Sequence, residues 1–198
     1  MTTPVAGPGG NESPALTDAL IDQFTLRLTG VGGQVHRVAG SREVSRIVVD
    51  IAGRGADRTV WVSDDIRRLA VELVQAIRDA GLEPRVPGSP SEVRDQPLGL
   101  GIAVAAIAET GSVIMSEPTV PNRAVTLMTE TLAIVCETST LLPSLDEASA
   151  VLREIGASGA SYATFITGPS RTADIERQLT VGVQGPGVYH VLLVDHLT

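Results

Sequence analysis

Lysine is absent from this chain of 198 residues, and its fifteen basic residues are all arginine. Without lysine the protein cannot form a Schiff base, attach pyridoxal phosphate covalently or build a P-loop. A bound anion must therefore be held by arginine, hydroxyl or backbone N–H groups. Aromatic residues are also few, at 3%, and the formal net charge is −8. These values argue against a nucleic-acid partner, which requires a basic surface and stacking platforms.

Cysteine occurs once, at Cys136, and three histidines accompany it. One cysteine cannot form an intramolecular disulfide, a zinc knuckle or an iron–sulfur cluster held by this chain alone. It ends the apolar segment 132–136, which favours an inert core thiol. His190 and His196 would lie about 20 Å apart on one face of an extended strand, too far to share a metal ion. We therefore expect no metal and no cofactor bound by this chain, so redox metal chemistry would need a partner.

Long apolar segments are missing as well. The longest, residues 102–108, is far too short to cross a bilayer, so no membrane insertion is expected. The first fourteen residues lack the basic and apolar regions of a signal peptide, which favours a cytoplasmic location. Residues 1–12 are rich in glycine, proline and threonine without periodicity, and we interpret them as a mobile tail. Residues 13–198 can bury one sizeable core, which indicates a single domain.

Apolar residues at helical spacing predict three helices in the first half of the chain. The first begins at Ser13 and Pro14 and ends near residue 30, with an apolar stripe formed by Leu16, Leu20, Phe24 and Leu28. The others cover residues 41–52 and 65–80. Short β-type segments at residues 34–38 and 59–62 precede helix signals. Residues 87–97, rich in proline, serine and charge, predict a surface loop that is an insertion or a lid.

The second half of the chain continues this alternation and adds a hairpin. Residues 102–108 and 113–115 flank a turn and predict a β-hairpin. Three further strands and two further helices are expected: strands at 132–136, 162–167 and 188–194, and helices from the capping box at 144–147 and near 172–181. Strands that alternate with helices predict an α/β fold, with an open, largely parallel sheet, helices on both faces and the added hairpin.

The turn over residues 166–176 is the best candidate for a binding site, because ligands of open α/β sheets bind in strand-to-helix turns. Gly168 ends the strand sharply, and Ser170 or Thr172 can cap the helix whose first N–H groups then point outward. With Arg171 these groups would form an anion site without lysine. Asp174 suits the helix dipole but would compete with a bound anion. The alternative is an ordinary capped turn in which Arg171 forms a salt bridge with Asp174 or a neighbour.

Four other residues are candidates of a weaker kind. Gly185 belongs to the glycine-rich loop 182–187, which lacks the dinucleotide-binding order and is expected to pack beside the Gly168 turn. His190 lies near this loop. Glu109 directly follows seven apolar residues, so partial burial could make it a general base or nucleophile, while the alternative is a solvated hairpin turn. Arg123 is either a second anion contact or a loop charge.

Three segments resemble the lactate utilisation protein C family, whose module is called the LUD domain. They are residues 107–112 (IAETGS), 167–176 (TGPSRTADIE) and 182–195 (GVQGPGVYHVLLVD), and the likeness is strongest from about residue 99 onward. The resemblance implies a fold similar to those of ribose-phosphate isomerase, glucosamine-phosphate deaminase and coenzyme A transferases. It also implies a link to the oxidation of lactate to pyruvate together with partner proteins that carry iron–sulfur clusters.

Two functional hypotheses follow from the resemblance and the residues together. In the first, the chain is a subunit or accessory factor of lactate utilisation that binds a small organic anion at the Gly168 turn, while iron–sulfur partners carry the electrons. In the second, it is an independent enzyme that acts on a coenzyme A ester or a sugar phosphate through Glu109. The turn that bears Glu109 resembles the glutamate-bearing turn of coenzyme A transferases, which is an analogy of fold.

Overall fold

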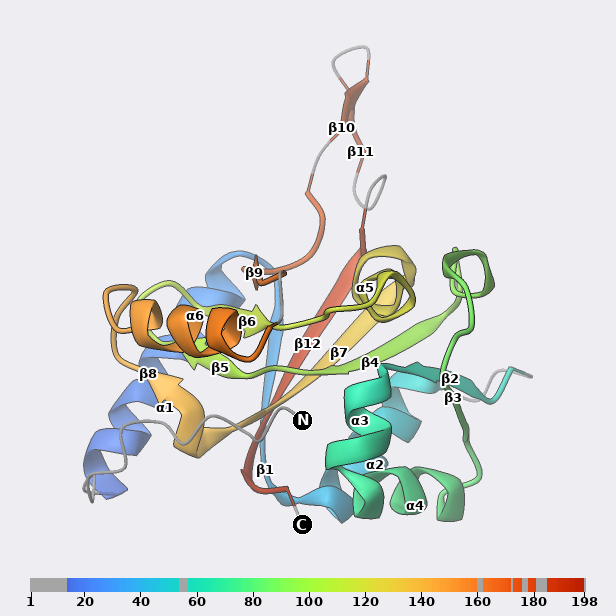
Figure 1. The fold of residues 1–198 in the computed structure, drawn as a ribbon, viewed down its shortest axis with the longest axis horizontal. Helices are drawn as coiled ribbons and strands as arrows, with labels where there is room; N and C mark the ends of the chain where they lie inside the picture. Colours follow the sequence, from blue (N-terminus) through green and yellow to red (C-terminus); the bar gives the residue numbers. More distant parts are fainter. Residues whose placement is uncertain are drawn as a thin grey trace.

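The core of the protein is a six-stranded sheet in which every pair of neighbouring strands is parallel (Figure 1). The computed structural model describes residues 14–53, 57–159, 162–171, 173–175, 178–180 and 185–197, so the tail expected over residues 1–12 lies outside it. The strand order is β1 (Gln34–Gly40), β12 (Val188–His196), β7 (Thr131–Glu137), β4 (Leu98–Ile102), β2 (Thr59–Val62) and β3 (Glu83–Arg85). The predicted α/β class and parallel sheet are confirmed, while the closer likeness to ribose-phosphate isomerase stays a prediction.

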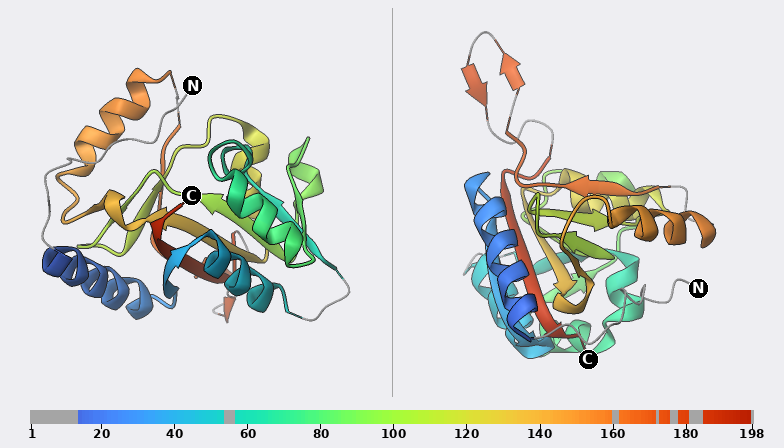
Figure 2. Two further views of the ribbon diagram at one scale, coloured as in Figure 1. Left: turned by 90° about the horizontal axis from the view of Figure 1, so that it is seen from below. Right: turned by 90° about the vertical axis from the view of Figure 1, so that its left-hand side faces the viewer.

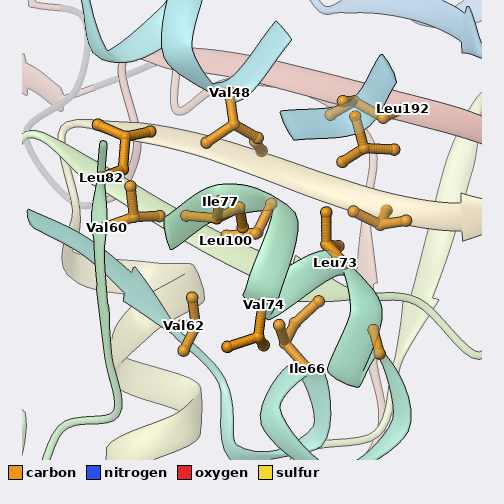
Figure 3. Packing of buried hydrophobic residues seen from close by; sticks show 14 of the residues in the cluster. Val48, Val60, Val62, Ile66, Leu73, Val74, Ile77, Leu82, Leu100 and Leu192 are labelled. Atoms are coloured by element: carbon orange, nitrogen blue, oxygen red, sulfur yellow. The ribbon is translucent and has the colours of Figure 1, made fainter. Parts of the chain in front are cut away.

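Three helices cover one face of this sheet: α2 (Ser41–Ala52), α3 (Asp64–Leu69) and α4 (Val71–Asp79). Their apolar side chains, among them Val48, Leu73 and Ile77, pack against Leu100 and Leu192 of the central strands (Figure 3). The bounds of α2 match the prediction. This layer therefore forms as helical periodicity indicates, with the apolar stripe turned toward the sheet.

The single helix expected over residues 65–80 is wrong, because the chain breaks at Ala70. Ala70 leaves the helical region with φ −125° and ψ 55°, and it is buried while Leu69 is exposed. No glycine or proline marks this break, so the local sequence carries no signal for it. The two helices meet the sheet as separate segments.

The other face of the large sheet packs against α1 (Pro14–Gly30) and a second, smaller sheet. Leu20, Phe24 and Leu28 of α1 share one core cluster with the large sheet. The small sheet has the order β8 (Leu141–Leu142), β5 (Ala105–Ile107), β6 (Ser112–Met115) and β9 (Thr164–Ile166). Helix α6 (Ala148–Ala157) packs on its far face, which adds a further layer (Figure 2).

The predicted hairpin is confirmed by the antiparallel pairing of β5 with β6, but its first strand is shorter than expected. The apolar segment 102–108 is divided between two sheets, since Ile102 ends β4 and Ala105 begins β5. The strand expected at 162–167 is β9, which pairs antiparallel with β6 and not with the large sheet. At the capping box the Ser144 hydroxyl donates to the Glu147 carboxylate at 3.2 Å, and the helix begins just after it.

Helix α5 (Val120–Met128) was not predicted, although a signal for it exists. Thr119 precedes it and accepts a hydrogen bond from the backbone N of Asn122 at 3.4 Å, and Pro121 lies in its first turn. A threonine cap followed by proline is typical of a helix start. The helix packs over Trp61 of β2, beside the short 3₁₀ turn at Pro90–Glu92.

The helix expected near residues 172–181 is wrong. Two strands, β10 (Ala173–Ile175) and β11 (Gln178–Thr180), pair antiparallel there, and they stand away from the rest of the protein in Figure 1. Ala173, Ile175 and Leu179 alternate with polar residues in the sequence. This period of two favours a strand over a helix. No helix among the described residues is long and apolar enough to cross a membrane.

Candidate functional site

At the carboxyl ends of its strands, which we call the carboxyl edge, the large sheet has a topological switch point between β2 and β4. The amino ends of the strands form the amino edge. After β2 the chain enters α3, whose Ile66 packs in the cluster of the α2 face. After β4 it enters β5, whose Ala106 packs in the cluster of the opposite face. Neighbouring strands whose connections leave on opposite faces form the crevice in which α/β proteins bind ligands. We call this place the β2/β4 crevice.

Polar side chains from α3 and α5 meet at the β2/β4 crevice. Ser63, the residue after β2, is buried, and its hydroxyl accepts from the backbone N of Ile66 at the start of α3. The side-chain oxygen of Asn122 accepts from the backbone N of Asp64 at 3.1 Å. Asp65 is mostly buried and forms an ion pair with Arg68. These bonds fix the first turn of α5 against the first turn of α3.

Glu117 lies two residues beyond β6, and only 2% of its surface is exposed. Its Oε2 accepts a hydrogen bond from the Thr126 hydroxyl at 2.7 Å, while Oε1 has no partner among the described residues. Thr126 packs beside Gly101, near the carboxyl end of β4. Burial raises the pKa of Glu117 to about 7, the charge of Asp65 adds to the increase, and Thr126 and Arg123 oppose it. A carboxyl group with such a pKa exchanges its proton near neutral pH.

Arg123 of α5 lies beside the same segment. Its guanidinium donates to the carbonyl oxygens of Pro118 at 3.3 Å and Thr119 at 3.4 Å. The guanidinium carbon lies 4.3 Å from the ring centre of Tyr162, in a cation–π contact. Arg123 forms no ion pair with any described carboxylate. Arg123 is therefore not a loop charge, because it belongs to helix α5. It lies next to the buried carboxyl group of Glu117, and its role as an anion contact stays a prediction.

The predicted anion turn lies at the opposite, amino edge of the large sheet. The backbone N of Ser170 donates to the carbonyl of Pro186 at 2.8 Å, just before β12 begins. Gly168 adopts a positive φ of 128°, and a Cβ there would lie 3.1 Å from Val31, just before β1. A Cβ on Gly185 would lie 3.3 Å from Ser170. The structure thus brings Gly168, Ser170 and Gly185 together, as predicted, but at the edge that the rule for α/β sheets does not favour.

Arg171 is exposed and extends over Gly32, in the turn that follows α1. A Cβ on Gly32 would lie 3.0 Å from a guanidinium nitrogen of Arg171, so the missing side chain leaves room for this arginine. The helix whose amides were expected to assist Arg171 is absent, because β10 takes its place. Asp174 belongs to β10, and Thr172 lies outside the described residues.

A chain of hydroxyl groups connects two of the family-like segments. The Thr110 hydroxyl donates to Ser112 at 2.8 Å, and Ser112 shares a second hydrogen bond of 2.8 Å with Thr167. Gly111, with a φ of 68°, lets this turn approach the backbone of α1, where a Cβ would lie 2.6 Å from the N of Leu28. The turn after β5 and the Gly168 turn therefore form one surface, which we call the amino-edge turn cluster.

Comparison with known proteins agrees with the resemblance of the three segments 107–112, 167–176 and 182–195 to the LUD domain. The model of the LUD domain matches residues 21–194. This chain belongs to the LUD domain family. A lactate utilization protein C from Oceanobacillus iheyensis is 31% identical over 197 residues, which cover 91% of this chain and 82% of that protein.

Other relatives of this LUD domain match over a shorter stretch. Lactate utilization protein C from Bacillus subtilis is 35% identical over 101 residues, or 50% of this chain and 42% of the relative. Lactate utilization protein C from Bacillus licheniformis is 35% identical over 92 residues, which cover 45% of this chain and 38% of that protein. The matches thus span about two fifths of these two relatives. The crystal structure of a DUF162 family protein from Deinococcus radiodurans shares the fold, with a TM-score of 0.64 at 19% identity over 90% of this chain and 98% of that one.

His190 of the LUD domain does not face the amino-edge turn cluster. It alternates along β12 with Tyr189 and Val191, which pack toward α1. Its Nδ1 lies 3.1 Å from Nε2 of His36, and the two rings stack. Burial, and then the neighbouring His36, lower the pKa of His190 to about 4, and burial lowers the pKa of His36. No cluster of three or more His, Cys, Asp or Glu within the described residues could hold a metal ion.

Glu109 lacks the partial burial on which its catalytic role was predicted. The residue is exposed in the turn of the β5–β6 hairpin, and its carboxylate accepts from the backbone N of Leu145 at 2.9 Å. The alternative of a hairpin turn exposed to solvent therefore describes it. Glu117 was missed, although it also follows an apolar segment closely. The rule that selected Glu109 does not reach it, because only three apolar residues, 113–115, and then Ser116 precede Glu117.

Proposed function

We propose that this LUD domain protein acts in lactate utilisation, as a subunit or accessory factor that works with iron–sulfur partner proteins and binds a small organic anion at the amino-edge turn cluster. The support for the pathway is the relatives named lactate utilization protein C, one of which aligns over most of both chains. The alternative, an enzyme that acts on a coenzyme A ester or a sugar phosphate through Glu109, requires partial burial of that carboxyl group, and Glu109 is exposed.

The case for iron–sulfur partners rests on the electron balance. Oxidation of a 2-hydroxy acid to a 2-oxo acid releases two electrons and two protons, so an acceptor is required. The one cysteine, Cys136, is buried, and burial raises the pKa of its thiol to about 12. A cluster needs several thiolate ligands. We expect the protein captured from lactate-grown cells at physiological salt to retain an iron-containing partner, and capture of an iron-free protein alone would contradict this.

The exposed Arg171 guanidinium beside Gly32 carries the proposal for anion binding. Among the described side chains, no carboxylate forms an ion pair with it. Thr110 and Thr167, whose hydroxyl groups bond to the buried Ser112, lie on the same turn cluster and offer further hydrogen bonds. An arginine fork with nearby hydroxyls is the combination that a carboxylate requires when lysine is absent.

Arg171→Ala is expected to weaken the binding of L-lactate or pyruvate by roughly 10- to 100-fold, because a charge-assisted hydrogen bond contributes about 1.5–3 kcal/mol. Isothermal titration calorimetry on the purified protein measures this change. Arg153→Ala is the matched control, since Arg153 is a helical arginine whose Nε bonds to the carbonyl of Ser149 on α6. Equal affinities for the wild type and Arg171→Ala would contradict an anion site at this turn.

A further inference from the structure

A buried side-chain oxygen of Glu117, Oε1, has no hydrogen-bond partner among the described residues. A buried acceptor without a hydrogen bond costs about 1–3 kcal/mol, and native proteins keep few of them. Oε1 of Glu117 is such an atom, in a side chain that is 2% exposed. It lies at the β2/β4 crevice, which the chain topology selects for ligands independently of any side chain. Two separate observations therefore point to the same place.

Arg123 supplies a positive charge beside this carboxyl group. Its bonds to Pro118 and Thr119 are long, at 3.3 and 3.4 Å, and both acceptors are neutral carbonyls. A carboxylate forms shorter and stronger bonds to guanidinium than these. An anionic ligand can thus replace these two carbonyl groups as the partner of the Arg123 guanidinium.

The other charges around Glu117 balance one another. On α3, Asp64 pairs with Arg67 and Arg68, and Asp65 pairs with Arg68. The α5 side contributes Arg123, while the adjoining β4 and β6 contribute uncharged residues. With Glu117 protonated, the crevice therefore has one positive charge in excess, and with Glu117 ionised it has none.

We propose that the β2/β4 crevice is a second ligand site, which binds a small organic carboxylate between Arg123 and protonated Glu117. The ligand carboxylate bonds to the guanidinium and accepts a hydrogen bond from Oε1–H of Glu117, while Oε2 keeps the hydrogen bond from Thr126. Binding to the ionised form of the protein takes up one proton from solvent, which Glu117 holds. This inference goes beyond the proposed function and does not depend on the amino-edge turn cluster.

Calorimetric titration of pyruvate into the Arg171→Ala protein tests this site apart from the first one. Because the pKa of Glu117 is about 7, the protonated fraction falls about tenfold between pH 6 and pH 8, and the affinity is expected to fall by the same factor. Titrations at one pH in buffers of different ionisation enthalpy should show proton uptake. Glu117→Gln keeps a hydrogen-bond donor without a titrating group, so it should retain binding and lose both the pH dependence and the proton uptake.

Arg123→Gln provides a second variant that removes the charge and keeps the α5 cap of Thr119. This variant should lower the affinity for pyruvate at least tenfold at pH 6. Thermal unfolding checks that the variant is folded. Loss of all pyruvate binding in Arg171→Ala would overturn the crevice site and leave the amino-edge site standing. Unchanged proton uptake in Glu117→Gln would also overturn it. Unaltered, proton-coupled binding in Arg171→Ala would support the crevice and contradict the amino-edge proposal.

Discussion

Glu117→Gln is expected to stabilise the protein at pH 8 by on the order of 3 kcal/mol, since burial raises the pKa of Glu117 from 4.5 to about 7. Below pH 4.5 the carboxyl is protonated in both the folded and the unfolded state, so the variant gains nothing there. As pH rises from 4.5 to 7 the unfolded state releases its proton first, and the free energy of unfolding of the wild type falls. Above pH 7 the buried carboxylate has its full cost.

Urea unfolding of the wild type and Glu117→Gln at pH 5 and pH 8 measures this difference. The comparison must be made at each pH, because His190 acts in the opposite direction. Its pKa is lowered from 6.5 to about 4, so it reduces stability as pH falls through that range. The difference between the two proteins cancels the contribution of His190. If the free energies of unfolding of the wild type and Glu117→Gln differed by the same amount at pH 5 and pH 8, Glu117 would not titrate in the folded state as inferred.

Gly99→Ala is expected to destabilise the protein by at least about 3 kcal/mol, near the upper end of the usual cost of overpacking. Gly99 lies in β4, against the last turn of α5. A Cβ there would lie 2.6 Å from the Thr129 hydroxyl and 2.6 Å from the carbonyl oxygen of Val125. The carbonyl belongs to the helix backbone, so the clash is relieved only when α5 moves. The midpoint of thermal unfolding should fall by about 6–12 °C.

Gly156→Ala is the matched control for this substitution. Gly156 lies in α6, and a Cβ there would meet nothing within 4 Å. Alanine favours the helix over glycine by about 0.5–1 kcal/mol, so this variant should be more stable than the wild type. If Gly99→Ala unfolded at the same temperature as the wild type, this result would contradict the inference that α5 packs too closely on β4 to admit a Cβ at residue 99. Displacement of α5 by Gly99→Ala should also disturb the β2/β4 crevice.

The sequence predicted the elements whose signal is local. Helices α1 and α2, the strands before and after α2, and the β5–β6 hairpin follow from apolar spacing and turn residues, and the structure confirms them. The break at Ala70 and the division of residues 102–108 between two sheets carry no such signal. The helix expected at 172–181 was argued from capping residues alone, whereas the alternation of Ala173, Ile175 and Leu179 favours the strands that form.

For the candidate sites, the sequence predicted that the two glycine turns pack together but could not predict at which end of the strands they lie. Gly168, Ser170 and Gly185 do meet, yet at the amino edge, because β9 pairs with β6 instead of joining the large sheet. Glu117 escaped notice because its importance depends on burial. That burial comes from α5 and Thr126, and from the approach of α3, which begins more than fifty residues earlier in the chain.

The amino-acid sequence by itself determined which reactive groups are present: fifteen arginines without lysine, a lone cysteine, and the segments that reveal a LUD domain. It also determined which faces of the early helices and strands are apolar, because side-chain spacing within one element reports that directly. Only the tertiary structure decided the strand order, and with it the two edges and the switch point between β2 and β4. Only the tertiary structure could desolvate Glu117, since a carboxyl group loses its water to contacts made by residues distant in sequence.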